Sequence, residues 1–129
     1  MPNYYFDHVH LTSPDPLRTA EFYERMFGAR RVDIREIIDG RTLVDLILNE
    51  SAIKVSQPRA QSLVPGASQP CSGLEHFGLR TDNLEAAVDE LKTKGVKFLQ
   101  EIRVLNPKIK ISFFLAPEDV AIELVERSS

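Results

Sequence analysis

Apolar and polar positions alternate along several short runs of this chain and recur at helical spacing along two longer ones. Residues 4–12 alternate with period two, which predicts a strand whose polar face carries His8 and His10. A run at helical spacing follows, and its predicted buried stripe consists of Leu17, Ala20, Tyr23 and Phe27. Three more alternating runs predict strands at residues 30–38, 41–49 and 51–57. The first half of the chain therefore predicts the order β-α-β-β-β.

Local signals mark where the predicted helix and the first hairpin begin and end. Asp15 can cap the helix, with Pro16 as its first residue, because a carboxylate accepts the free N–H groups there and proline needs none. Gly28 ends the helix, since glycine adopts the left-handed conformation common at this position. The "DG" pair at residues 39–40 predicts a hairpin turn between two strands.

The second half of the chain repeats the first. The segment "HVHLTSPDPLRTAEFYERMFG" at residues 8–28 has a counterpart in "HFGLRTDNLEAAVDELKTKG" at residues 76–95, and "AIKVSQ" at 52–57 has one in "AIELVE" at 121–126. In the second copy Asp82 and Glu85 form a capping-box pattern. The predicted stripe there is Leu84, Ala87, Val88 and Leu91, followed by a stop at Gly95 and strands at 97–104, 109–116 and 120–126. A period of half the chain indicates a duplicated module.

The predicted fold class is α+β, with two βαβββ modules in a single domain over residues 1–129. The modules cover about residues 4–57 and 74–126, and a linker rich in proline and glycine covers about 58–73. A helix covers one face of each sheet, so the other face needs a partner, which the other module can supply. We therefore expect the modules to pair into a curved mixed sheet around a cavity.

Composition removes several classes of function. Hydrophobic residues make up 43% and charged residues 27% of the chain, with a net charge of −3, as in an ordinary globular domain. The absence of a basic cluster argues against nucleic acid as a partner, and no apolar run is long enough to span a membrane. The start lacks the pattern of a secretory signal, and the single cysteine, Cys71, excludes an internal disulfide; both features favour a cytoplasmic location.

Strand alternation selects the side chains that would line the cavity. Apolar positions of the first and last strands of each module should face the helices, so the opposite parity lines the cavity: His8, His10, Lys54, Ser56, His76, Gly78, Arg80 and Glu123. Two imidazoles and a carboxylate, from His8, His76 and Glu123, form the ligand set of a metal site with open positions for substrate. A single histidine at such a position is more often a hydrogen-bonded core residue, and Glu123 alone would be read as an exposed strand residue; the repeat-equivalent positions of His8 and His76 favour the site.

These motifs resemble the vicinal oxygen chelate superfamily, which includes glyoxalase I, methylmalonyl-CoA epimerase, fosfomycin resistance enzymes, extradiol dioxygenases and bleomycin-binding proteins. The resemblance covers the whole chain and is carried by "DHVHLTSPDPLRTAEFYERMFG", "GLEHFGLRTDNLEAAVDELKTKGV" and "AIELVE". It implies a small-molecule substrate or ligand, a homodimer and a divalent metal ion (Fe, Ni, Zn or Mn). It places the four metal-holding positions at His8, Lys54, His76 and Glu123.

Lys54 departs from the family pattern, because glyoxalase I has a glutamate and the epimerase a glutamine at this position. A protonated ammonium has only donors and cannot bind a metal. In one interpretation the metal stays on His8, His76 and Glu123, and Lys54 acts nearby as an electrophile or proton carrier. In the other, Lys54 pairs with Glu123 and the ion pair replaces the metal.

The favoured function is a metalloenzyme of the lyase or isomerase type, as in lactoylglutathione lyase or the epimerase. In that chemistry the metal stabilises an enediolate or enolate while a base removes the proton next to a carbonyl. The candidate catalytic residues are Lys54, His10 and Glu123, and His10 could equally be a polar wall residue. Two alternatives are an extradiol-type dioxygenase with a His/His/Glu iron site, and a metal-free ligand-binding protein of the bleomycin-resistance type with a Lys54–Glu123 ion pair.

Overall fold

The structure is a computed structural model that describes residues 3, 6–37, 39–59 and 74–128. The chain divides into two compact units, Met1–Ala67 and Ser68–Ser129. Most of the predicted linker, with Cys71, and the first residues of the first predicted strand lie outside the described residues. Each unit contains the order β-α-β-β-β, so the predicted α+β class is confirmed.

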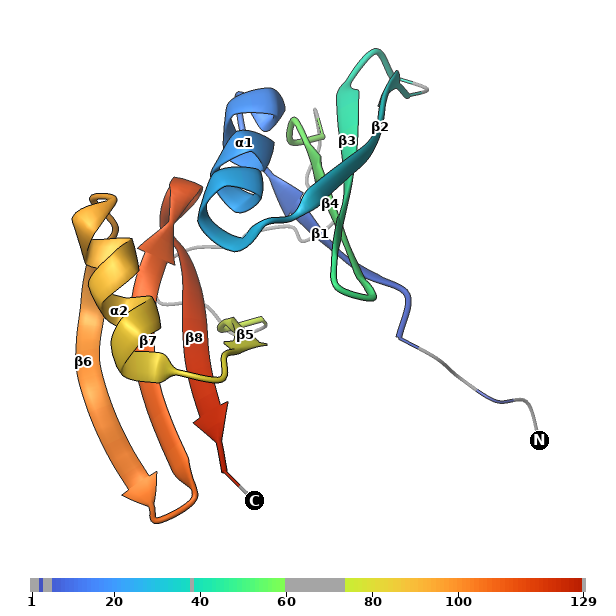
Figure 1. Ribbon diagram of the computed structural model, residues 1–129. Helices are drawn as coiled ribbons and strands as arrows, with labels where there is room; N and C mark the ends of the chain where they lie inside the picture. The colour runs from blue at the N-terminus through green and yellow to red at the C-terminus, as the bar shows by residue number, and fades with distance from the viewer. Residues whose placement is uncertain (1–2, 4–5, 38, 60–73, 129) are drawn as a thin grey trace. The chain divides into compact units, whose positions relative to one another are not determined.

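Unit 1 is a four-stranded sheet with a helix on one face (Figure 1). Its elements are β1 (His8–Thr12), α1 (Pro16–Phe27), β2 (Arg30–Glu36), β3 (Thr42–Leu48) and β4 (Ser51–Ser56). The strand order is β1-β4-β3-β2, and β1 runs parallel to β4 while the other pairs are antiparallel. The first strand of the unit therefore lies beside the last.

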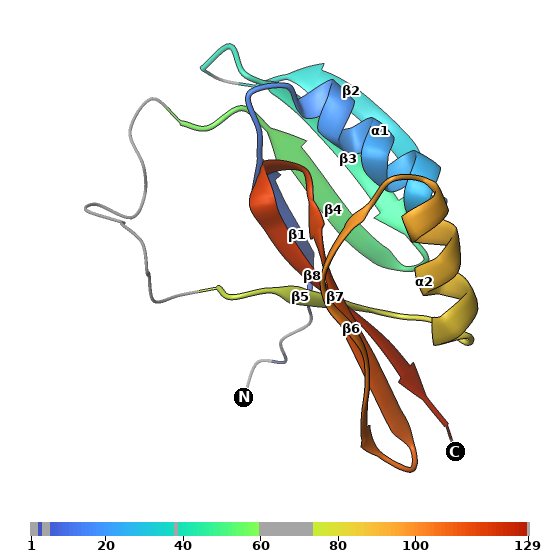
Figure 2. The same cartoon turned by 90° about the vertical axis from the view of Figure 1, so that its left-hand side faces the viewer.

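Unit 2 repeats this topology (Figure 2). Its elements are β5 (Phe77–Arg80), α2 (Leu84–Thr93), β6 (Lys97–Asn106), β7 (Ile109–Ala116), a short 3₁₀ turn η1 (Pro117–Asp119) and β8 (Val120–Arg127). The order is β5-β8-β7-β6, with β5 parallel to β8. Neither helix is long and apolar enough to span a bilayer, as far as the described residues extend.

Lys54 and Glu123 occupy equivalent places in the two sheets. Lys54 lies on β4 opposite His10 of β1, and Glu123 lies on β8 opposite Gly78 of β5. Both strands are parallel to the first strand of their unit and antiparallel to the third. The prediction that the repeated phrases at 52–57 and 121–126 form equivalent strands is therefore confirmed.

The cores of the two units include most of the apolar positions that alternation assigned to the helix side: Leu11, Ile53, Val55, Ile122 and Leu124 are buried. In unit 1 the buried residues of the central strands are Leu43, Val44, Leu46, Ile53, Val55 and Ser56. The predicted helical stripe is wrong at Leu17, which is 43% exposed, whereas Pro16 and Thr19 are buried. Successive helical residues are rotated by about 100°, so a face centred on Pro16 and Tyr23 leaves Leu17 at its side. The Thr19 hydroxyl donates to Ser13 Oγ at 2.7 Å, which satisfies it inside the core.

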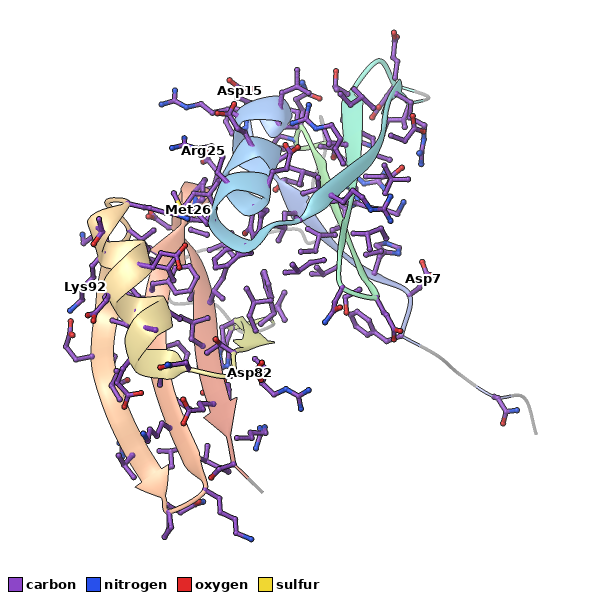
Figure 3. All side chains as sticks on the ribbon, in the orientation of Figure 1. Asp7, Asp15, Arg25, Met26, Asp82 and Lys92 are labelled. Carbon is purple, nitrogen blue, oxygen red and sulfur yellow. The ribbon has the colours of Figure 1, made fainter. Side chains whose placement is uncertain are left out.

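The start of α2 differs from the prediction. Asn83, rather than Asp82, is the N-cap, and its side-chain oxygen accepts the Ala86 N–H at 3.1 Å. Glu126 of β8 accepts the Leu84 N–H at 2.8 Å, so a neighbouring strand satisfies the first helical donor. Asp82 lies just before the helix (Figure 3), whereas Asp15 caps α1 as predicted.

Replacing each candidate N-cap of α2 in turn shows whether Asn83 or Asp82 caps the helix. Asn83→Ala removes the acceptor for the Ala86 N–H, and we expect it to lower the free energy of unfolding by about 1 kcal/mol. The matched control is Asp82→Ala, which should change stability by much less. Urea denaturation of the three proteins measures both effects, and a larger loss in Asp82→Ala would restore the sequence-based assignment.

Candidate functional site

The sheet face of unit 1 opposite α1 carries a row of polar side chains, one from each strand. The register places His10 beside Lys54, Lys54 beside Asp45, and Asp45 beside Asp33. Alternation puts these residues on one face, because their neighbours Ile53, Val55, Val44 and Leu46 are buried on the other. The row is therefore a continuous polar strip across the sheet.

Lys54 has a carboxylate partner inside its own unit. Its Nζ donates to Asp45 Oδ1 at 2.6 Å, and the two side chains are 25% and 17% exposed. Arg35 of β2 also donates to the Asp45 carboxylate. Burial raises the pKa of Asp45, but the hydrogen bonds from Lys54 and Arg35 outweigh it and hold that pKa below its ordinary value. Asp45 therefore stays ionised and is the ion-pair partner of Lys54.

Sequence analysis missed Asp45, although a signal for it was present. Asp45 is the single charged residue in the apolar run of β3, "TLVDLIL". Leu48 pairs with Ser51 across a two-residue turn, which fixes the register of the hairpin and sets Asp45 opposite Lys54. Identifying that turn at residues 49–50 would have located the partner of Lys54 from the sequence.

His10 is held through one ring nitrogen. Its Nε2 lies 2.8 Å from Ser56 Oγ, and the Ser56 hydroxyl donates to the Gln57 carbonyl oxygen at 2.9 Å. Because the Ser56 proton is used there, His10 Nε2 carries the proton of the His10–Ser56 bond and Nδ1 keeps its lone pair. Partial burial and the positive charge of Arg41 lower the pKa of His10, so the imidazole is neutral at pH 7.

His8 lies two residues before His10, opposite Ala52 of β4. Its Nδ1 is 2.7 Å from the Oδ2 of Asp7, which precedes β1 (Figure 3). Within unit 1 the residue opposite Lys54 on the neighbouring strand is thus His10. His8 lies on the same face of β1 and is opposite Ala52.

The corresponding face of unit 2 brings together two of the predicted ligands. His76, just before β5, has its Nε2 3.4 Å from Oε1 of Glu123 on β8. The two side chains are 29% and 22% exposed. The Nδ1 of His76 lies 3.0 Å from Oε1 of Glu75, and its ring meets Phe113 edge-on at 5.0 Å. A carboxylate on one nitrogen and an aromatic ring beside it set the direction of the imidazole.

The two units differ at the position opposite the charged residue of the last strand, where unit 1 has a histidine and unit 2 a glycine. Gly78 holds the place that His10 occupies in unit 1, and a Cβ added there would lie 3.8 Å from Glu123 Oε1. Unit 2 therefore has no side chain beside Glu123 at the position where His10 stands beside Lys54. His76 itself lines a cavity of about 410 Å³, together with Glu75, Leu99, Gln100, Phe113 and Ala121.

The spacing of His76 and Glu123 fits two neighbouring ligands of one metal ion. With metal–ligand bonds of about 2.0–2.2 Å in tetrahedral geometry, adjacent ligand atoms are separated by about 3.3–3.6 Å, and the pair stands at 3.4 Å. No group of three or more potential His, Cys, Asp or Glu ligands gathers among the described residues. His8 belongs to unit 1, so the complete set of His8, His76 and Glu123 stays a prediction.

Comparison with curated proteins shows relatives over nearly the whole chain. Methylmalonyl-CoA epimerase of Homo sapiens mitochondria is 29% identical over 124 residues, which cover 93% of this chain and 70% of that protein. Lactoylglutathione lyase of Schizosaccharomyces pombe is 26% identical and matches 99% of this chain. The match spans 49% of the lyase, so this chain corresponds to about half of that protein.

Solved structures share the fold at lower identity. A glyoxalase family protein from Enterococcus faecalis has a TM-score of 0.76 and 21% identity, covering 95% of this chain and 97% of its own. A fosfomycin resistance protein from Listeria monocytogenes has a TM-score of 0.74 and 14% identity, covering 95% and 91%. The family model described as Glyoxalase/Bleomycin resistance protein/Dioxygenase superfamily matches residues 5–124. The chain therefore belongs to this superfamily.

Proposed function

We propose that this protein is a metal-dependent lyase or isomerase. It would remove the proton from the carbon next to a carbonyl group of a small molecule and then return it. The observation that carries the proposal is the pair formed by His76 Nε2 and Glu123 Oε1, 3.4 Å apart beside an open cavity. His8, His76 and Glu123 would hold the divalent metal. When bound, the metal supplies Lewis-acid stabilisation of negative charge on adjacent substrate oxygens.

His10 is the proposed proton acceptor. Ser56 fixes its ring through Nε2, and the lone pair on Nδ1 is left to take a proton from carbon. The protonated imidazole can then return the proton as a general acid. A base that accepts and returns one proton is what a lyase or isomerase of the enediolate type needs.

Lys54 has a different proposed role, because its ammonium is paired with Asp45. Its ammonium has three N–H donors, and one of them donates to Asp45 at 2.6 Å. The others can donate to an oxygen of the substrate on which negative charge develops. Lys54 then replaces a ligating glutamate or glutamine with a hydrogen-bonding cation.

The names of the relatives indicate a substrate class to test first. Methylmalonyl-CoA and lactoylglutathione are both thioesters with a C–H next to the thioester carbonyl and a second oxygen function nearby. Such compounds offer two oxygens to one metal and an acidic proton to one base. We propose a thioester or related carbonyl compound of this kind as the substrate, whereas a homodimer and a cytoplasmic location stay predictions from the sequence.

Deuterium exchange tests the proposed reaction. Protein loaded with Ni(II), Zn(II), Mn(II) or Fe(II) is incubated with each thioester in D₂O, and loss of the proton signal next to the carbonyl is followed by NMR. We expect exchange that requires metal and falls at least about 100-fold in His10→Ala, the usual scale of a lost acid–base group. Oxygen uptake with catechols would favour the dioxygenase instead. Tight ligand binding without metal or exchange would favour the bleomycin-resistance type.

A further inference from the structure

An acidic residue directly precedes the candidate ligand histidine in each unit. The pairs are Asp7–His8 and Glu75–His76, and in both the carboxylate lies at Nδ1, at 2.7 Å and 3.0 Å. Asp7 and Glu75 both stand just before their strands, where alternation does not force neighbouring side chains to opposite faces. The same contact thus occurs twice, on a backbone that permits it.

The contact determines which ring nitrogen of a neutral histidine carries the proton. A carboxylate accepts only, so the nitrogen facing it must donate, and Nδ1 is protonated while Nε2 keeps its lone pair. In unit 2 that lone pair faces Glu123 Oε1 at 3.4 Å. The two atoms are both acceptors in this state, so neither can donate a hydrogen bond to the other. A metal cation between them would bind both lone pairs.

We propose that Asp7 and Glu75 are positioning residues, which fix His8 and His76 with Nε2 unprotonated and ready to bind a metal. The inference rests on the proposed function, since it assigns these carboxylates a role toward the same metal. Both carboxylates are 88% exposed, so solvent competes with each contact. We therefore expect each to contribute near the lower end of the range of about 10–100-fold in metal affinity typical of such outer partners.

The first measurement is made without metal. Protein with ¹⁵N-labelled histidine, kept in chelator at about pH 8.5 where imidazoles are neutral, reports by ring-nitrogen chemical shift which nitrogen carries the proton. We expect the Nδ1–H form to dominate for His8 and His76. Asp7→Ala should return His8 to the Nε2–H form without changing His76, and Glu75→Ala should do the reverse. Each variant is then the control for the other histidine.

The second measurement is the dissociation constant for Zn(II) or Ni(II). Asp7→Ala and Glu75→Ala should each weaken binding by about tenfold, and Asp7→Asn, whose amide oxygen still accepts Nδ1–H, should recover most of the loss. Glu50→Ala, which removes one exposed carboxylate from the β3–β4 turn of the same unit, should have no comparable effect.

The outcomes separate this inference from the function on which it rests. Unchanged histidine proton positions in Asp7→Ala and Glu75→Ala would overturn the positioning role, whatever the metal affinity. Metal affinity unchanged in both variants would overturn it as well, and leave the proposed function intact. A wild-type protein that binds no divalent metal would overturn the proposed function, even if the proton positions shift as expected.

Discussion

His76→Ala and Glu123→Ala will each abolish tight binding of a divalent metal, whereas His10→Ala will leave it intact. The first two variants remove an atom of the pair that stands 3.4 Å apart in unit 2. Loss of an outer partner of a metal ligand costs about 10–100-fold in affinity, so loss of a ligand itself should exceed about 100-fold. His10 has its Nε2 bonded to Ser56 and is not one of the proposed ligands.

Isothermal titration with Zn(II) or Ni(II) measures this effect, and thermal unfolding provides a second readout. A metal at 100 times its dissociation constant adds about 2.7 kcal/mol to the free energy of unfolding. That increment should appear in wild type and His10→Ala and be absent from His76→Ala. Glu123→Gln keeps the size of the side chain and controls for misfolding of the alanine variant. Wild-type affinity in His76→Ala would show that this pair does not hold the metal.

The choice of His10 as a control also tests the division of roles on the first strand. His8 and His10 share one face of β1, and the sequence offers His8 as a metal ligand and His10 as a catalytic or polar wall residue. His8→Ala should lose metal and proton exchange together. His10→Ala should keep the metal and lose the exchange, because its proposed task is to accept a proton through Nδ1.

The fold could be predicted because its determinants are local and repeated. Gly28 and Gly95 end their predicted helical runs and adopt positive φ, and the duplicated phrases form β4 and β8. The errors at Leu17 and Asp82 have a different origin. The buried face of α1 is set by packing against β3 and β4, and the first N–H of α2 is satisfied by Glu126 from a distant strand. Neither contact is visible in a local pattern.

The candidate site could be predicted only in part, for the same reason. Alternation places Lys54 and Glu123 on the polar face of equivalent strands, but it does not name their partners. Glu123 approaches His76, which the repeat had already singled out. The partner of Lys54 is Asp45, which has no equivalent acid in unit 2, because Phe113 stands there opposite Glu123. A repeat identifies what the two halves share and is silent about such a difference.

Asp45→Asn will destabilise the protein at neutral pH, and the deficit will disappear in acid. The substitution leaves Lys54 and Arg35 without their shared carboxylate. Breaking a buried pair costs about 3–5 kcal/mol and an exposed pair contributes about 0–1 kcal/mol. At 25% and 17% exposure the Lys54–Asp45 pair lies between these limits, so we expect a loss of about 2 kcal/mol in the free energy of unfolding.

The direction of the pH dependence follows from the lowered pKa of Asp45. A carboxyl group whose pKa is lower in the folded state stabilises the protein above its unfolded pKa of about 3.9. That stabilisation is lost as the pH falls through the folded value, so wild type and Asp45→Asn should converge in acid. Asp33→Asn is the matched control, because Asp33 also bonds Arg35, at 3.2 Å, but is 52% exposed. Its effect should stay within about 1 kcal/mol at all pH values.

Double-mutant cycles then decide whether Lys54 forms its ion pair with Asp45 or with Glu123. Combining Lys54→Met with Asp45→Asn should show a coupling energy of about 1–2 kcal/mol, since the two side chains touch at 2.6 Å. Combining Lys54→Met with Glu123→Gln in metal-free protein should show coupling near zero, because the ammonium already has its partner in β3. The reverse result would mean that Lys54 and Glu123 form the ion pair of a metal-free binding protein. In that case Glu123 would not be free to bind a metal, and the proposed enzyme function would fail with it.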